Sequence, residues 1–82
     1  MSREEIFTEL NDIFRNNFDD AGITLTDETS SKDIEDWDSL EQINLIVAIQ
    51  DKFQVKFNID EVNAMKNVGE MADFILQKID TL

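Results

Sequence analysis

One pattern recurs four times along this sequence: a residue that caps helices is followed three positions later by glutamate. In such a pair the first side chain accepts a hydrogen bond from the first helical turn, and the glutamate can return one. The four pairs are Ser2 with Glu5, Asp38 with Glu41, Asn58 with Glu61, and Asn67 with Glu70. The pattern therefore predicts four helix starts in a chain of 82 residues.

The spacing of apolar residues after these starts is helical. It predicts a first helix over about residues 3–17, a second from Asp38 through Phe53, a short third near residues 59–65, and a last one after Asn67. The apolar stripe of the last helix comprises Val68, Met71, Ala72, Ile75, Leu76 and Ile79. Residues 55–57 alternate briefly, but a run of this length is too short to build a sheet.

Residues 19–37 show no sustained period and are rich in turn-forming residues. Ile23, Leu25, Ile34 and Trp37 interrupt this polar stretch, so we expect a long loop that is held on the core by apolar anchors. The predicted fold is all-α, a four-helix bundle of three long helices and a short third one, with the long loop between helices one and two. We expect one domain over residues 1–82.

Composition excludes several classes of function. The 19 acidic residues outnumber the 7 basic ones and give a net charge of −12, so we expect no nucleic-acid partner. No segment is apolar enough for a signal peptide or a membrane span, so we expect a cytoplasmic protein without membrane insertion. His and Cys are absent, which excludes the usual zinc sites, a Cys nucleophile and any Ser-His pair within the chain. The short chain also leaves little room for an active-site pocket. We therefore expect no enzyme activity.

The second helix carries two apolar stripes. Leu45, Ile46, Ile49 and Phe53 share one direction and form the predicted core face. A second stripe, Leu40, Ile43 and Val47, adjoins the direction of Ser39. Either the helix is central and buried all round, or this second stripe is exposed and suited to docking another protein. Periodicity alone favours neither interpretation.

Ser39 follows the predicted N-cap, Asp38. A hydroxyl at this position lies near free N–H groups and the positive end of the helix dipole, which favours an attached or bound phosphate. The alternative is that these two residues only start a helix. Because the chain has no His, any base that activates Ser39 must come from another protein.

The run from Trp37 through Phe53, which begins Trp-Asp-Ser-Leu, resembles the attachment site and second helix of acyl carrier proteins. The likeness extends in order and spacing over nearly the whole chain. It implies that a phosphopantetheinyl transferase attaches 4′-phosphopantetheine from coenzyme A to Ser39. The thiol of this arm would then carry an acyl or related group as a thioester, and Asp38 would help to present the serine to the transferase.

The same resemblance implies a docking surface and partners. Leu40, Ile43 and Val47 would form its apolar part, with Trp37 and Glu41 beside them. The implied partners are an acyl-activating ligase or synthase and an acyltransferase with basic docking surfaces, and the carrier would be a monomer. Trp37 before the Asp-Ser-Leu run is more typical of specialised carriers, in polysaccharide modification, alanyl transfer or secondary metabolism, than of bulk fatty-acid synthesis.

Two alternatives compete with the carrier. One is an acidic helical interaction module without covalent chemistry. The other is an EF-hand-like site, since alignment on Gly22 places Asn17 first, Asp19 third and Glu28 twelfth in a calcium loop. Ala21 then occupies a ligand position without a side-chain oxygen, so we expect no metal site.

Overall fold

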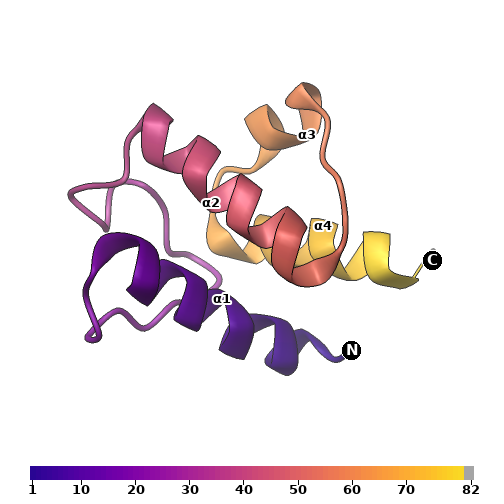
Figure 1. Ribbon diagram of the computed structural model, residues 1–82, viewed down its shortest axis with the longest axis horizontal. Helices are drawn as coiled ribbons and strands as arrows, with labels where there is room; N and C mark the ends of the chain where they lie inside the picture. Colours follow the sequence, from indigo (N-terminus) through magenta and orange to yellow (C-terminus); the bar gives the residue numbers. More distant parts are fainter. Residues whose placement is uncertain (81–82) are drawn as a thin grey trace.

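The computed structural model describes residues 1–80 and contains four helices (Figure 1). They are α1 (Arg3–Phe18), α2 (Ser39–Phe53), α3 (Ile59–Ala64) and α4 (Val68–Asp80). No strand occurs among the described residues. The predicted all-α fold, with a short third helix and a long loop after the first, is confirmed. Residues 81–82 of the expected domain lie outside the described part.

The predicted capping boxes form at α1 and α3, but the prediction is only half right at α2. Asp38 accepts from the Glu41 N–H at 2.9 Å, as expected. The Glu41 carboxylate does not return the bond; its Oε1 instead accepts from Asn17 and from Asn44, at 3.1 Å each. The end of α1 thus offers Glu41 a donor from a different helix, and the side chain links α1 to α2.

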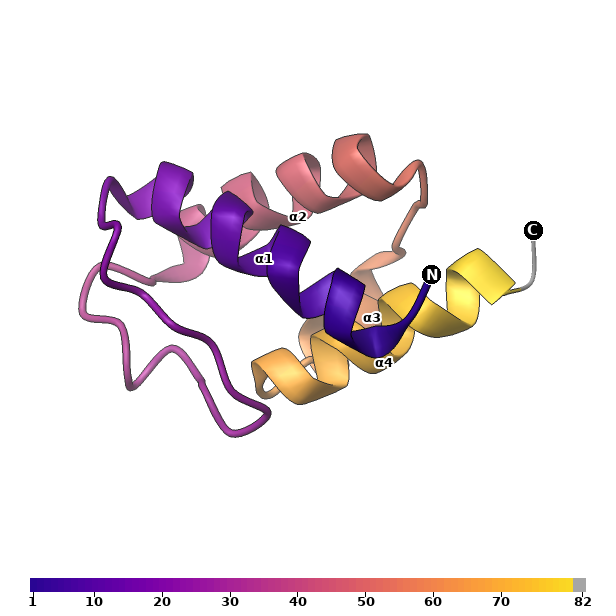
Figure 2. The ribbon, with the colours of Figure 1, turned by 90° about the horizontal axis from the view of Figure 1, so that it is seen from below.

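Three helices build the core. α1 packs against both α2 and α4, and Figure 2 shows it lying across them. The buried residues of these helices are Ile6, Leu10 and Phe14 of α1, Leu45, Ile46, Ile49 and Phe53 of α2, and Val68, Met71, Ala72 and Ile75 of α4. The predicted core face of α2 is therefore confirmed, and most of the stripe predicted for α4 is fully buried.

The long loop between α1 and α2 is fastened to the core, as its apolar residues predicted. Leu25 is buried, and Ile23 packs against the core from its edge. Polar side chains of α1 hold the backbone beside them: Asn11 Oδ1 accepts from the Leu25 N–H at 2.8 Å, and Arg15 Nε donates to the Ile23 carbonyl at 2.6 Å. The loop therefore has a defined path that leads from α1 to the start of α2.

The same loop caps the start of α4. The Val68 N–H donates to the Thr29 carbonyl at 2.8 Å, and the Gly69 N–H donates to the Asp27 carbonyl at 3.0 Å. Arg3 closes this junction, because its Nη2 lies 2.5 Å from Asp27 Oδ1 and 3.2 Å from the Gly69 carbonyl. Three segments far apart in the sequence are thus tied together by hydrogen bonds to the first turn of α4.

Candidate functional site

Ser39 is the first residue of α2 and is exposed. Its hydroxyl has no hydrogen-bond partner among residues 1–80. Asp38 occupies the cap: its side chain accepts from the Glu41 N–H and its carbonyl from the Gln42 N–H, both at 2.9 Å. Within the described part, the N–H groups of Ser39 and Leu40 remain without a partner. An anion held on Ser39 would therefore meet free donors and the positive end of the helix.

Trp37 corrects one expectation for this site. We predicted it as part of a docking surface, but only 9% of the residue is exposed. Its ring meets Phe14 edge to face, with centroids 5.1 Å apart, and its Nε1 donates to Gln42 Oε1 at 2.8 Å. The extended backbone of the cap at Asp38 separates an inward Trp37 from an outward Ser39. Trp37 is thus the core anchor that the apolar residues of the loop predicted, and it holds the loop where α2 begins.

The second stripe of α2 faces solvent. Leu40 is 65% exposed, Ile43 59% and Val47 58%, which decides between the two interpretations of this stripe. Ile59 of α3, at 72%, belongs to the same small group of exposed large apolar residues. Sequence reasoning missed Ile59; its only signal was an apolar residue in a short helix without an apolar stripe. Glu41 is half-buried, and its carboxylate bonds Asn17 of α1 and not the exposed stripe.

A groove of about 550 Å³ lies beside Ser39. One side comes from the start of α2 and the other from α3 and the connection to α4. Residues of both sides are Ser39, Ile43, Ile59, Val62, Asn63 and Lys66. The groove thus offers apolar side chains, an amide and an ammonium group to anything attached to the Ser39 hydroxyl.

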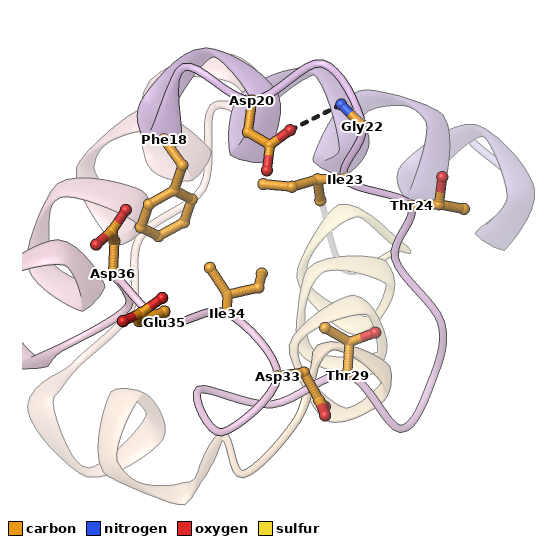
Figure 3. A pocket seen from close by; sticks show the side chains of 10 residues that line it. All are labelled: Phe18, Asp20, Gly22, Ile23, Thr24, Thr29, Asp33, Ile34, Glu35 and Asp36. Atoms are coloured by element: carbon orange, nitrogen blue, oxygen red, sulfur yellow. Dashed lines mark hydrogen bonds between the residues drawn. The ribbon is translucent and has the colours of Figure 1, made fainter.

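A second hollow, of about 390 Å³, lies within the long loop (Figure 3). Phe18, Ile23 and Ile34 point toward one another in it, and its other lining residues include the acidic side chains Asp20, Asp33, Glu35 and Asp36. In residues 1–80, no group of three or more His, Cys, Asp or Glu side chains is arranged to hold a metal ion.

Negative charge is concentrated around the site. Residues 19–41 contain nine acids and one Lys, a net charge of 1 − 9 = −8 out of the −12 of the whole chain. A partner that approaches Ser39 therefore meets a strongly negative surface, which favours basic partners. As for membranes, none of the helices in the described residues is long and apolar enough to cross one.

Comparison with known proteins gives consistent matches. A family model described as the phosphopantetheine attachment site matches residues 19–75. An acyl carrier protein of Acidothermus cellulolyticus is 40% identical over 78 residues, 92% of this chain and 89% of that protein. One from Lactobacillus acidophilus is 31% identical over 75 residues, 92% and 94% of the two chains. The solution NMR structure of holo acyl carrier protein from Geobacter metallireducens matches with a TM-score of 0.87 and 44% identity, over 92% of this chain and 86% of that one.

Proposed function

The chain belongs to the phosphopantetheine attachment site family and is an acyl carrier protein, and from this premise we propose that Ser39 is its attachment residue. As a member of this family it bears 4′-phosphopantetheine and is a carrier and not a catalyst. It works with a phosphopantetheinyl transferase and with biosynthetic enzymes. The observation that carries the assignment is the exposed, unbonded hydroxyl of Ser39 at the start of α2.

The surroundings of Ser39 fit this prosthetic group. Unpaired N–H groups at the start of α2 suit a phosphodiester, and the adjacent groove is open to the arm. When bound, the group supplies the thiol that carries an acyl group as a thioester. The chain itself has no Cys that could do so. In our proposal Asp38 holds Ser39 at the helix start, and the transferase supplies the base, since no His is present.

Docking belongs to the exposed stripe of α2. Leu40, Ile43 and Val47 form its apolar part, and Glu41 follows Leu40 in the first turn. Residues 19–41, which lead into this stripe, carry a net charge of −8, so the complementary surfaces are apolar patches with basic rims, on an acyl-activating ligase or synthase and on an acyltransferase. We further propose a cytoplasmic monomer that serves as a single carrier domain in a specialised pathway, an assignment favoured by Trp37. Trp37 itself is left out of the docking surface.

Intact-mass measurement tests the attachment site. The protein is incubated with coenzyme A and a transferase of broad specificity, together with Ser39→Ala and Ser31→Ala. Ser31 is the matched control, because it is an exposed serine that lines the same groove. Wild type and Ser31→Ala should each gain one phosphopantetheine group, and Ser39→Ala should gain none. A mass gain in Ser39→Ala would refute the assignment.

A further inference from the structure

We propose that Lys66 pairs with the phosphodiester that joins the prosthetic arm to Ser39 and so positions the start of the arm beside α3. This inference rests on the proposed attachment at Ser39. Lys66 lies in the connection between α3 and α4, and both residues line the groove of about 550 Å³ described above. Lys66 would be a positioning residue, since the carried group reacts at the far end of the arm.

Most basic side chains of this acidic chain already have acceptors. Arg3, Lys52 and Lys78 pair with carboxylates, and Arg15 donates to a backbone carbonyl. Lys32, Lys56 and Lys66 form no ion pair within residues 1–80. Of these three, Lys66 is the one that lines the groove with Ser39. It is therefore a cation that is available to a new anion at this place.

Electrostatics favours the pairing. A phosphodiester adds a negative charge beside Asp36, Asp38 and Glu41, which repel it. The ammonium group of Lys66 belongs to the opposite side of the groove and has a flexible four-carbon stem that lets it approach the phosphate. Because both residues line one groove, the attraction acts at low salt and is screened as the Debye length falls from about 30 Å at 0.01 M to about 10 Å at 0.1 M salt.

The pairing sets the direction in which the arm leaves Ser39. Attraction to Lys66 draws the phosphodiester toward α3, whereas repulsion by the acidic loop disfavours the opposite direction. Ile43 and Ile59, the two exposed apolar residues that line the groove, would then be the side chains nearest to the first atoms of the arm. Lys66, which lies outside α2, would thus help to position the phosphodiester attached to α2 at Ser39.

The test uses the loaded protein as wild type, Lys66→Gln, Lys66→Arg and Lys56→Gln. Lys56 is the matched control, because it is also exposed and unpaired but lines a different hollow. Two signals are measured at low salt and at about 1 M salt: the ³¹P shift of the phosphodiester, and the heteronuclear NOE of the arm amide nearest to it. Lys66→Gln should move the ³¹P resonance and lower the NOE, whereas Lys66→Arg and Lys56→Gln should resemble wild type. The difference should shrink at about 1 M salt, where the Debye length is about 3 Å.

Mass spectrometry separates the two proposals. If the wild type gains no mass, attachment at Ser39 is refuted, and the role of Lys66 with it. If all variants are loaded but Lys66→Gln gives wild-type signals at low salt, the role of Lys66 alone is overturned. Equal changes in Lys66→Gln and Lys56→Gln would also overturn it, because they would reflect net charge alone.

Discussion

At the scale of single residues, the site depends on three consecutive residues whose environments differ. Trp37 is buried, Asp38 caps the helix, and Ser39 is exposed with a free hydroxyl. The cap accounts for this change of direction, because its extended backbone ends the loop and its side chain bonds the Glu41 N–H. An indole that was held less firmly against Phe14 would leave the start of α2, and with it Ser39, less well defined.

Of the two glycines, Gly69 is the one at which an added methyl group should cost more stability. A Cβ there would lie 2.8 Å from the Asp27 carbonyl oxygen, a backbone atom that itself accepts from Gly69. Gly69→Ala should therefore lower the free energy of unfolding by about 1–3 kcal/mol, less whatever part the higher helix propensity of Ala, about 1 kcal/mol, offsets. Urea denaturation measures this change.

Gly22→Ala is the control for that substitution. Its Cβ would lie 3.2 Å from Asp20 Oδ1, which belongs to an exposed side chain that can move aside. The loss of stability should be clearly smaller than for Gly69→Ala. Equal losses in the free energy of unfolding would show that the close approach of Gly69 to the loop does not make this position more sensitive to a methyl group.

At the scale of elements, α2 has two apolar faces, one in contact with the core and the other exposed to solvent. One face packs into the core with α1 and α4, while no helix of the described residues covers the other. α3, with only six residues, does not cover Leu40, Ile43 or Val47, and Ile59 of α3 adds to the exposed apolar surface. An uncovered apolar face on a helix that follows a strongly acidic loop is suited to transient docking.

Val47→Asp tests this face. Because Val47 is exposed, the free energy of unfolding should change by no more than about 0.5 kcal/mol. Loading by the transferase, or acyl transfer by a partner, should slow by roughly fivefold or more, as for loss of an interface contact worth about 1 kcal/mol. Gln77→Glu, on the exposed surface of α4, adds the same charge elsewhere and should leave both unchanged. A Val47→Asp protein that unfolds would instead place this residue in the core.

The capping box of α3 should make stability depend on pH. The Asn58 N–H, which donates to Glu61 at 3.0 Å, and then Lys78, at 2.9 Å, hold the pKa of Glu61 below its usual value. A lowered pKa means that the charged form stabilises the fold above the ordinary glutamate pKa, and that this contribution is lost as the pH falls through the lowered value. Glu61→Gln should therefore melt below wild type at pH 7, and the gap should close toward about pH 3, well under the ordinary value of about 4.3.

Thermal melts followed by circular dichroism at both pH values measure that gap. Glu28→Gln is the control, since it removes the same charge from an exposed loop residue that makes no side-chain hydrogen bond in the described part. Its melting temperature should not fall below that of wild type at pH 7 in a way that disappears at about pH 3. A gap for Glu61→Gln that is equally large at both pH values would contradict the assigned cause.

At the scale of the whole molecule, charge and compactness oppose each other. A net charge of −12 on a chain of 9.5 kDa repels itself, and two-thirds of it surrounds the loop and the start of α2. The negative charge is concentrated near Ser39, where it would attract an incoming basic enzyme. Electrostatic steering of this kind raises encounter rates more than it raises affinity.

Added salt should therefore stabilise the protein. The melting temperature should rise as NaCl is increased from about 0.01 M to about 1 M, because the Debye length falls from about 30 Å to about 3 Å. MgCl₂ should raise it at lower concentration. Asp36→Asn, with one loop charge removed, should melt above wild type at low salt and approach it at high salt. A melting temperature that is indifferent to both salts would argue against self-repulsion.

Much of this molecule follows from local sequence. Helix starts, helix lengths and the position of Ser39 in the first turn of α2 were all predicted, because capping bonds join residues only three apart and apolar spacing sets the helical period. The departures occur where contacts join distant residues. Asn17 takes Glu41 out of its expected capping box. Trp37 was expected both as an anchor of the loop and as a docking residue, and its packing on Phe14 leaves it only the first role.

Burial is what only the tertiary structure decided. The sequence by itself determined that α2 has two apolar stripes, but which of them is covered depends on where α1, α3 and α4 pack. The same packing brings Ile59 and Lys66 to one groove with Ser39, although they follow Ser39 by 20 and 27 positions in the sequence. Local hydrogen bonds depend on short separations that can be read from sequence, whereas solvent exposure depends on every element that packs nearby.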